Sequence, residues 1–365
     1  MSRMTLKDIA QELGLSLNTV SDVLNGGDTR YSEKTRKRIH ETANRLGYRA
    51  NRQAQILAGV KSGLIGIIKA INFHQSGVER ALYAGEAIHK NGFKLLSYDI
   101  LWHYDGLEHA VQTMLDARVA GVLIDGIESS PEVRAAIQRL LKARIPLISL
   151  HGILQPEVPH VTVDFYQAGR LLADHLLSLG YRRLAFIGPK AALESGDPAR
   201  SIIRRLVGCR ERVAEAQKSG ACLEVIAAPA GESDDLVAAS AYEPGIRAMR
   251  RILELGRLPD AIICSNDLYA IGALKACREA GVRVPDDLAI VGFDNIAVGS
   301  YFDPSLTSVT SESKAAAQAA VDLLFRSIRE EDFKSTTSVS LPCTLVIRES
   351  CGFADRSTRE APSLP

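Results

Sequence analysis

Features that would assign this chain to a specialised class are missing from its 365 residues. No uninterrupted apolar run reaches the ~18 residues that a membrane helix needs. Charges already occur in the first turns of MSRMTLKDIAQELG, which argues against a signal peptide, so we expect a cytoplasmic protein. No two of the six cysteines have C-x2-C spacing, and we interpret all six as reduced thiols. With 46% hydrophobic and 24% charged residues, the composition excludes disorder and collagen and is typical of a globular protein with two or three domains.

Motifs of the common enzyme classes are missing as well. We find no G-x-S-x-G elbow, no P-loop and no G-x-G-x-x-G after the first expected strand. Trp102, His103, Tyr104 and His109 form a local cluster that could stack on a sugar or hold zinc, but further metal ligands at suitable spacing are lacking. We favour an ordinary loop that leads into a helix near Asp105. The sequence therefore predicts no catalytic residue, no metal site and no cofactor.

Charge is distributed unevenly along the chain. The whole sequence carries a formal net charge of +1, which by itself argues against a nucleic-acid partner. Residues 1–61, however, hold 11 Lys and Arg against 6 Asp and Glu, whereas the remainder holds 33 against 37. Because phosphate binding depends on local positive charge, this basic head favours a polyanion contact at the amino-terminal end, although a solvated helix face has the same composition.

Three short helices are predicted in the basic head. The sequence TLKD from Thr5 fits a capping box that starts a first helix, and Gly14 ends it. Ser16 can cap a second helix that runs through about Asn25, and Ser32 can cap a third. The short turn between the first two helices, entered through Gly14, is typical of a helix-turn-helix.

The second helix is expected to present four side chains outward: Leu17, Asn18, Thr19 and Asp22. A DNA major groove about 12 Å wide admits one helix, so the first residues of this helix can reach base edges. Basic residues of the third helix would then lie near phosphates: Lys34, Arg36, Lys37 and Arg38. The alternative is a three-helix packing module with a solvated basic face, and spacing alone does not separate the two interpretations.

A short segment, Asn51 to Gly59, is predicted to form about two helical turns. Isolated helices below ~12 residues are marginal in water, so its apolar pair, Ile56 and Leu57, needs a partner surface. Two readings stay open: a linker turn packed on the next domain, or a helix that folds in the minor groove and places an aliphatic wedge between base steps.

From Ser62 onward, short apolar runs alternate with helical stretches. The expected strands are Leu64–Ile68, Lys94–Tyr98, Gly121–Ile124, Pro146–Leu150, Leu184–Ile187, Leu223–Ile226, Ala261–Cys264 and Leu288–Gly292. Continuous apolar runs about 30 residues apart are typical of parallel strands with helices on both faces. Eight such units are too many for one compact sheet, so we predict a doubly wound α/β body in two lobes of about four strands each.

Polar residues follow several of these strands. They are Asn266 and Asp267, Asp294 and Asn295, His151, and Asp164 after Val161 to Val163. Each one alone is best interpreted as a helix N-cap. Together they indicate a polyhydroxylated ligand at the carboxyl edges of the two sheets, and an arginine such as Arg205 would add a fork of hydrogen-bond donors.

The order of three head segments carries a family resemblance. TLKDIAQELGLSLNTVSDVLNG, SEKTRKRIHETANRLGY and NRQAQILAG resemble the headpiece and hinge of the LacI/GalR family of bacterial transcription regulators. The body resembles the effector domain of that family, which is similar to periplasmic sugar-binding proteins, in VTVDFYQAGRLLADHLLSLGYRRLAFIG, RRLVG, AIICSNDLYAIGALKACREAGVRVPDDLAIVGFDN, DPSLTSV and LVIRES. The two matches together cover nearly the whole chain.

The resemblance implies the domain organisation. An all-α helix-turn-helix headpiece (1–49) and a hinge helix or linker (50–61) precede a two-lobed α/β effector and dimerisation domain (62–349) of the periplasmic-binding-protein type and a flexible tail (350–365). We expect the chain to cross between the lobes near Asp164, near Asp294 and near Ser305 to Thr310. The first lobe would then hold about 62–162 and 295–307, and the second lobe about 163–294 and 308–349.

The resemblance also implies the site residues. Leu17, Asn18 and Asp22 would read bases, and Leu57 would enter the minor groove at the operator centre. Further expected DNA contacts are Thr5, Thr19, Asn25, Arg36, Asn51, Arg52 and Ala54. The expected effector contacts are Arg205, Asp267 and Asp294 from the second lobe, with Asp164 at its start, and Phe73, His74 and His151 from the first.

Three positions depart from the family pattern. Asp22 stands where Arg is usual; it can accept from a cytosine amine but cannot donate to guanine, which leaves the operator sequence open. Ala50 replaces a proline before the hinge, which raises the ordering cost of that segment. An Asp is usual near His151, so the pocket favours a different sugar or an effector that is not a simple sugar.

We therefore expect a homodimeric transcription repressor of the bacterial nucleoid. Two heads would bind a near-palindromic operator in double-stranded DNA, and a small-molecule effector, a sugar or related metabolite, would change operator affinity allosterically. No enzyme activity and no membrane partner are expected. The alternatives are an α/β sugar-processing enzyme with an appended small domain, which lacks a catalytic constellation, and a sugar-binding receptor, which the basic head argues against.

Overall fold

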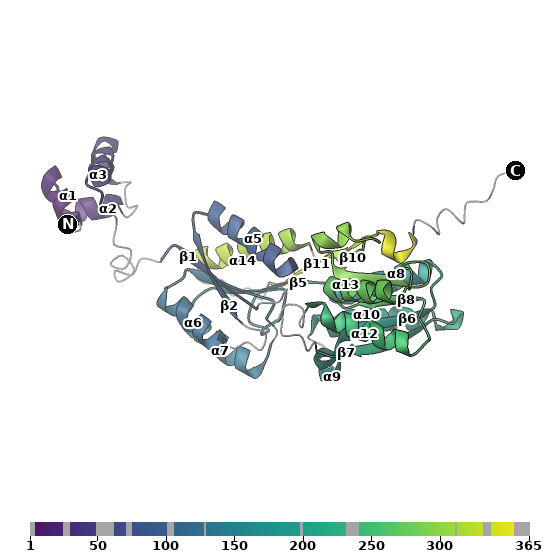
Figure 1. The fold of residues 1–365 in the computed structure, drawn as a ribbon. Helices are drawn as coiled ribbons and strands as arrows, with labels where there is room; N and C mark the ends of the chain where they lie inside the picture. Colours follow the sequence, from purple (N-terminus) through teal and green to yellow (C-terminus); the bar gives the residue numbers. More distant parts are fainter. Residues whose placement is uncertain are drawn as a thin grey trace. The chain divides into compact units, whose positions relative to one another are not determined.

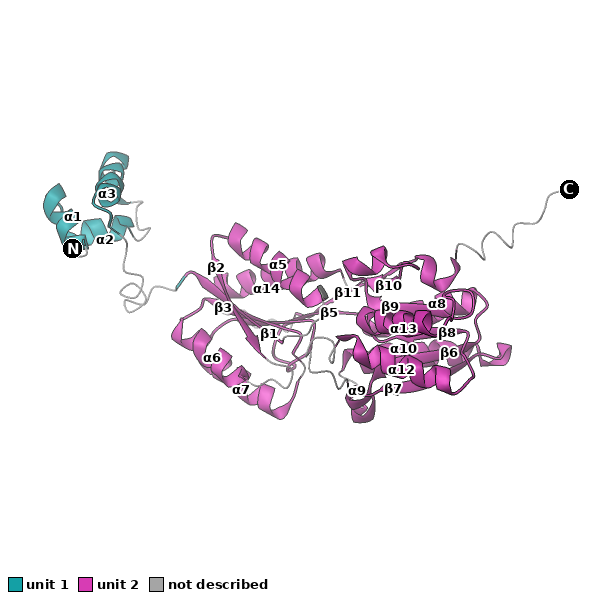
Figure 2. Cartoon of the chain, viewed as in Figure 1, with its two compact units in different colours: residues 1–62 teal, residues 63–365 magenta. Residues whose placement is uncertain are grey.

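A computed structural model describes residues 4–24, 30–48, 62–70, 75–100, 106–127, 129–197, 200–230, 241–310, 312–330 and 337–353 (Figure 1). The chain divides into two compact units, Met1–Ser62 and Gly63–Pro365 (Figure 2). In the described part of the chain, no helix is both long and apolar enough to cross a membrane.

The first unit is helical, as predicted, and its described residues form α1 (Leu6–Leu13), α2 (Leu17–Leu24) and α3 (Glu33–Arg45). At the start of α1, the Asp8 carboxylate accepts hydrogen bonds of 2.7 Å from the backbone N and from the hydroxyl of Thr5. These bonds lower the pKa of Asp8. Gly14 ends α1 at φ +64°, a left-handed conformation that glycine adopts without strain.

Serine caps start the other two helices of this unit, again as predicted. Thr19 N donates to Ser16 Oγ at 3.0 Å, and Thr35 N donates to Ser32 Oγ at 3.3 Å. The apolar faces of the three helices form one core, whose buried members are Ile9, Ala10, Val20, Val23, Ile39 and Ala43. This packing is the helix-turn-helix arrangement that the spacing indicates.

The first lobe of the second unit is a six-stranded sheet of order β11-β5-β4-β3-β1-β2. Its parallel strands are β1 (Leu64–Ala70), β2 (Lys94–Ile100), β3 (Gly121–Asp125), β4 (Leu147–Leu150), β5 (His160–Val163) and β11 (Val339–Leu341). Two helices cover each face: α5 (Gln75–Lys90) with α14 (Ser313–Arg329), and α6 (Leu107–Asp116) with α7 (Pro131–Lys142). Because Ile67 and Ile68 of β1 point to opposite faces and both are buried, a continuous apolar run results.

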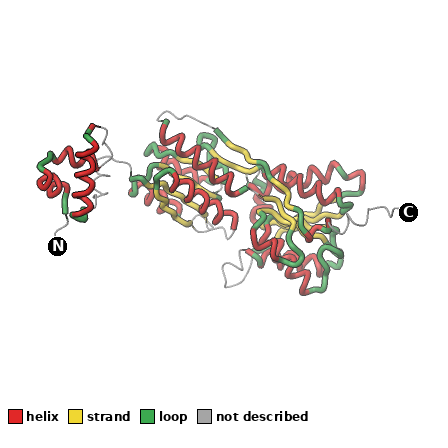
Figure 3. Tube along the Cα trace, turned by 90° about the horizontal axis from the view of Figure 1, so that it is seen from above, coloured by secondary structure: helices red, strands yellow, loops and turns green. Residues whose placement is uncertain are grey.

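The second lobe repeats this plan with a sheet of order β12-β10-β9-β8-β6-β7. Its strands are β6 (Arg183–Pro189), β7 (Cys222–Ala228), β8 (Ala261–Cys264), β9 (Ala289–Asp294), β10 (Thr307–Thr310) and β12 (Thr344–Val346). All neighbours are parallel except β10 and β12. One face packs against α8 (Phe165–Ser178) and α10 (Ser201–Glu215), and the other against α12 (Glu243–Glu254) and α13 (Asp267–Glu279). Figure 3 shows the strands of each lobe enclosed by helices.

The eight predicted strands are all present, which confirms the doubly wound α/β class. Each lobe nevertheless holds six strands rather than four, because β5 and the short strands β10, β11 and β12 complete the sheets. Smaller elements connect them: α9 (Lys190–Ser195) and the 3-10 turns η2 (Gln217–Ser219), η3 (Ala297–Tyr301) and η4 (Glu349–Cys351).

The predicted division of the lobes is wrong in its second and third crossings. The first crossing lies at Asp164, as expected, between β5 and α8. The chain does not cross near Asp294, because β9 and β10 pair as parallel neighbours in the second sheet. It crosses after Thr310, since α14 packs on the first sheet, and returns between Leu341 of β11 and Thr344 of β12. The first lobe therefore gains α14 and β11 in place of residues 295–307.

The start of the predicted flexible tail is also corrected. Ser350 and Cys351 are fully buried, and the imidazole Nε2 of His175 on α8 lies 3.3 Å from Cys351 Sγ. Tyr181 Oη donates to the carbonyl oxygen of Cys351 at 3.1 Å. Residues 350–353 thus belong to the second lobe, and residues 354–365 lie outside the described residues.

Burial lowers the pKa of His175 from its ordinary value of 6.5, which makes stability depend on pH. Below about pH 6.5 the unfolded chain binds a proton that the folded chain binds only at lower pH, so the unfolding free energy falls as the pH decreases. We expect urea unfolding of wild-type protein between pH 5 and 8 to show this loss and His175→Gln to reduce it. His89→Gln, at an exposed histidine, is the control. A His175→Gln variant with the wild-type pH slope would contradict the assignment.

Candidate functional site

The first residues of α2 form the exposed edge of the first unit. Leu17 is 49% exposed, Asn18 is exposed and Thr19 is partly exposed, whereas Val20 and Val23 are buried in the core. These three predicted DNA contacts at the helix start are therefore accessible. This is the geometry that a recognition helix needs to place its amino-terminal turn in a groove.

Asp22, also predicted to read bases, is engaged within the unit. Its Oδ2 accepts a hydrogen bond of 3.0 Å from Tyr31 Oη and lies 3.9 Å from Arg30 Nη2. The carboxylate thus ties α2 to the segment that leads into α3, an arrangement that sequence reasoning did not indicate. With 40% of its side chain exposed, Asp22 still presents one edge to solvent.

The remaining head predictions divide into two groups. Thr5 is exposed at the start of α1, and Arg36 is half-buried in the first turn of α3, beside the exposed Lys37. Five predicted DNA contacts lie outside the described residues: Asn25, Asn51, Arg52, Ala54 and Leu57. Apart from Asp22, the described DNA candidates thus lie at the starts of the three helices.

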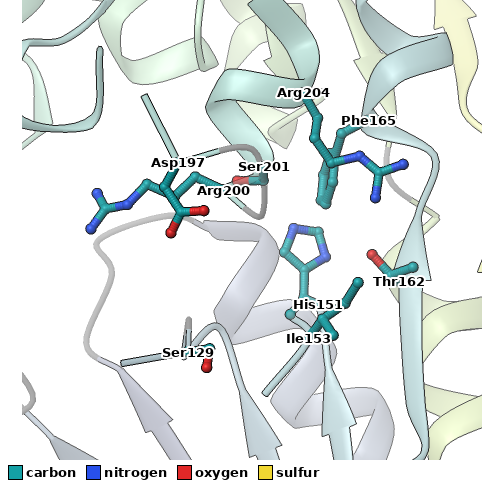
Figure 4. A pocket seen from close by; sticks show the side chains of 10 residues that line it. Ser129, His151, Ile153, Thr162, Phe165, Asp197, Arg200, Ser201 and Arg204 are labelled. Carbon is teal, nitrogen blue, oxygen red and sulfur yellow. The ribbon is translucent and has the colours of Figure 1, made fainter. Parts of the chain in front are cut away.

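A pocket between the two lobes of the second unit is lined by residues from both (Figure 4). The first lobe contributes Ser129, His151, Gly152 and Ile153, and Thr162 at the end of β5 completes that side. The second lobe contributes Phe165, Asp197, Arg200, Ser201 and Arg204. This position, beyond the carboxyl ends of β4 and β5, is where open α/β sheets bind ligands.

A stack of rings and a guanidinium runs from the pocket into the second lobe. The His151 ring meets the Phe165 ring edge-on, with 5.0 Å between centroids. On the inner side, Cζ of Arg205 lies 4.9 Å from the Phe165 centroid and 4.8 Å from that of Phe293. Cation–π contacts of this kind stabilise a guanidinium that burial would otherwise disfavour.

Arg205 lies behind the pocket wall rather than on it. It is 6% exposed, its Nη1 donates to the carbonyl oxygen of Ser265 at 2.6 Å, and its Nη2 lies 3.6 Å from Asp294 Oδ1. The structure therefore brings two predicted effector residues, Arg205 and Asp294, into one ion pair. Asp294 adopts φ +106°, so the loop after β9 is held in a conformation that residues with side chains rarely adopt.

Asp267 positions that loop. It is 1% exposed; its Oδ1 accepts a hydrogen bond of 2.6 Å from Ser308 Oγ, and its Oδ2 accepts one of 2.8 Å from Ile296 N. Burial, with the neighbouring charge of Asp294, raises the pKa of Asp267 well above its ordinary value. A Cβ on Gly292 would overlap the Asp267 carboxylate, so the glycine is required for this contact. In this structure Asp267 acts on the site through the 294–296 loop.

The other predicted effector residues have different outcomes. His151 lines the pocket, with φ +67° at the end of β4. Asp164 caps α8 by accepting from Gln167 N at 3.1 Å, the local role that its sequence position favours, and does not line the pocket. Phe73 and His74 lie outside the described residues.

Sequence reasoning missed the arginines that line the pocket. Arg200 and Arg204 are four residues apart at the start of α10 and therefore share a helix face, whereas Arg205 is turned by about 100° into the core. The four-residue spacing of Arg200 and Arg204 is the sequence signal that indicates a shared helix face. The resemblance at RRLVG selects the second arginine of this motif, Arg205. The packing of α10 shows instead that the first, Arg204, lines the pocket.

Glycines allow α10 to lie against α8 closely enough to place these arginines. A Cβ on Gly169 of α8 would overlap the carbonyl oxygen of Arg205, and a Cβ on Gly208 of α10 would overlap that of Tyr166. The two glycines thus face each other's helix backbone reciprocally. Gly245 and Gly272 make the same exchange between α12 and α13 on the other face of the sheet.

Comparisons with known proteins match both units. A model described as "Bacterial regulatory proteins, lacI family" matches residues 5–51, and a model of a periplasmic binding protein-like domain matches residues 173–351. Catabolite control protein A of Priestia megaterium is 29% identical over 350 residues, which cover 95% of this chain and 99% of that protein.

Solved structures share the fold. A lac repressor dimer bound to operator and the anti-inducer ONPF superposes with a TM-score of 0.78 at 24% identity, covering 96% of this chain and 99% of that chain. A complex of the transcriptional regulator CelR with cellobiose gives a TM-score of 0.65 at 24% identity, covering 95% and 100%. The helix-turn-helix unit and the two-lobed α/β unit are thus found together in these proteins.

Gly208→Ala should force α8 and α10 apart, because the new methyl group meets backbone rather than a movable side chain. We expect a loss of about 1–3 kcal/mol in the free energy of unfolding, measured by urea denaturation. Gly85→Ala is the matched control: it is also inside a helix, but its Cβ would lie 3.4 Å from Leu95 Cδ2, an ordinary contact. Equal stabilities of the two variants would show that the close crossing is not required.

Proposed function

Because this chain belongs to the LacI family of bacterial regulatory proteins and is a DNA-binding transcription regulator, we propose that it is a homodimeric repressor whose affinity for a near-palindromic operator is set by a small effector. The observation that carries this proposal is the combination in one chain of a helix-turn-helix unit and a pocket shared by two lobes. Acting on DNA, the protein would work in the bacterial cytoplasm, associated with the nucleoid.

The first unit supplies the DNA contact. We place Leu17, Asn18 and Thr19 at base edges, because the exposed start of α2 is free to enter a major groove. Exposed basic residues of α3 would neutralise nearby phosphates, and this neutralisation makes the DNA affinity depend on salt concentration. For Asp22 we propose a double role, in which Tyr31 fixes the carboxylate and its free edge accepts from a cytosine amine.

The homodimer is supported by an apolar strip on α5 of the first lobe. Val78 is 53% exposed, Leu82 is 68% exposed and Tyr83 is 36% exposed, and the first two lie one helical turn apart. Burial of such a strip in a two-fold interface would join two heads, and linking two weak DNA contacts raises affinity through effective concentration. The lac repressor structure that shares this fold is itself a dimer on operator.

For the effector we propose a sugar or related metabolite in the pocket between the lobes. Hydroxyl groups of Ser129, Thr162 and Ser201 line this pocket, and Phe165 gives it an apolar wall. The CelR relative of the same fold binds cellobiose. Ligand binding would change the angle between lobes that are joined at three crossings, and this change would reach the heads through residues 50–61.

Selection of binding sites from random duplex DNA tests the proposal. The full-length protein should enrich an inverted repeat, and its affinity for the selected fragment should fall steeply as salt rises. A chain that begins at residue 63 is the control and should enrich no sequence. Enrichment of single half-sites would contradict the dimer, and no enrichment by the full-length protein would contradict the proposed function.

Leu57→Ala is expected to weaken specific binding far more than non-specific binding. A leucine inserted between base steps offsets the free-energy cost of bending the operator. Non-specific DNA is not bent in this way, so it does not gain from the insertion. Fluorescence anisotropy with the selected operator and with a scrambled duplex should show at least a tenfold larger loss for the operator. Leu255→Ala, at an exposed leucine of the second unit, is the control. Equal losses on both duplexes would remove the minor-groove role of Leu57.

A further inference from the structure

The pocket between the lobes has an excess of positive charge among its lining residues. Arg200 and Arg204 line it, and Asp197 is the one carboxylate among the ten lining residues that the structure describes. The ring nitrogens of His151 add further hydrogen-bonding groups to the lining. A neutral sugar would leave this charge without a counterpart.

Arg204 differs from the other buried and half-buried arginines of α8 and α10. Arg170 pairs with Glu215 at 2.8 Å, Arg212 pairs with Asp174 at 2.7 Å, and Arg205 lies beside Asp294. Within the described part of the chain, the half-buried guanidinium of Arg204 makes no ion pair and no side-chain hydrogen bond. Its five N–H donors are therefore available to a ligand in the pocket.

The direction of the side chains identifies one end of the pocket. Figure 4 shows Arg204, the His151 ring and Thr162 converging on the same side, whereas the guanidinium of Arg200 extends away from His151 near Asp197. Phe165 lies beside Arg204 and next to the His151 ring, as an apolar wall. Cationic and hydroxyl donors thus meet at one end, while Ser129 and Ser201 remain for neutral hydroxyl groups at the other.

The start of α10 adds positive potential to the pocket at the end that Ser201 lines. Its N-cap residue, Arg200, makes no side-chain cap hydrogen bond, and Arg200 and Ser201 both line the pocket. The amides of a first helical turn have no partner inside the helix and carry a partial positive charge. A helix start and an arginine side chain in one pocket both favour a ligand that carries negative charge.

From this arrangement we infer that the effector is a phosphate ester of a polyhydroxylated molecule, whose phosphate binds at the end of the pocket where Arg204, His151 and Thr162 converge. A phosphate is preferred to a carboxylate because its three terminal oxygens match three side chains, Arg204, His151 and Thr162, that converge from different directions. The inference rests on the proposed function, since it names the chemical class of the effector.

Isothermal titration of the full-length protein with inorganic phosphate, at constant ionic strength, tests the anion site directly. We expect saturable binding to wild-type protein, binding at least tenfold weaker to Arg204→Gln, and partial recovery in Arg204→Lys. Arg210→Gln, at an exposed arginine of the same helix, is the matched control and should bind as wild-type. Equal binding by Arg204→Gln and Arg210→Gln, or no binding at all, would overturn the inference.

A second experiment distinguishes a phosphate from a carboxylate as the anionic group of the effector. Operator affinity of wild-type protein is measured with hexoses, with their phosphate esters and with the corresponding aldonic acids. A response to phosphate esters that Arg204→Gln loses would support the inference, and a response to neutral hexoses or to aldonic acids alone would overturn it. Phosphate binding at Arg204 without a response to any of these compounds would still support the anion site. Operator binding is also measured without any effector. If the protein bound no operator at all, that result would contradict the proposed function but would not contradict the anion site at Arg204.

Discussion

The buried guanidinium of Arg205 is the constraint on which the geometry of the second unit depends. Two phenyl rings, the Ser265 carbonyl oxygen and the Asp294 carboxylate surround it, and a charge at this depth is stable only if all these groups are in place. Meeting that requirement favours one rotation of α10, and Gly169 and Gly208 allow the helix to lie close to α8 in that orientation. The neighbouring Arg204 is then turned into the pocket, so the core interaction determines which side chain a ligand meets.

The same lobe anchors the connections between the lobes. Asp267 fixes the 294–296 loop through Ser308 and Ile296, and the two described crossings contact each other, since Asp164 N donates to the carbonyl oxygen of Leu341 at 3.1 Å. A ligand that contacts His151 on one lobe and Arg204 on the other would therefore act across a joint whose connecting segments are held at defined places. Such a joint lets the lobes move as bodies, which is what an effector-controlled regulator requires.

The sequence predicts elements that local interactions decide. The caps at Thr5, Ser16 and Ser32 and the stop at Gly14 act within one turn of chain, and the helices begin and end where these signals indicate. Buried parallel strands are likewise visible as continuous apolar runs. The missed strands are short and partly polar, as in TSVT of β10, and their place in a sheet depends on partners far along the chain. The second and third lobe crossings were therefore assigned to the wrong segments.

The candidate site shows the same limit at the level of single residues. His151 and the Arg205–Asp294 pair follow from positions at strand ends and from the RRLVG pattern, but the pattern does not show that Arg205 is a core residue and Arg204 a pocket residue. That distinction depends on the phase of α10 against α8, which two glycines set across 39 residues of sequence. Likewise, nothing local indicates that Tyr31 holds the carboxylate of Asp22.

The account is tested most directly by measuring operator affinity in the presence of metabolites extracted from the host bacterium and fractionated by anion exchange. We predict that a retained, phosphatase-sensitive fraction changes the affinity of wild-type protein by about fivefold or more, and does not change that of Arg204→Gln. A protein whose operator affinity responds to no fraction, or only to the neutral flow-through, would contradict the claim that a cationic pocket between two lobes controls the DNA-binding unit.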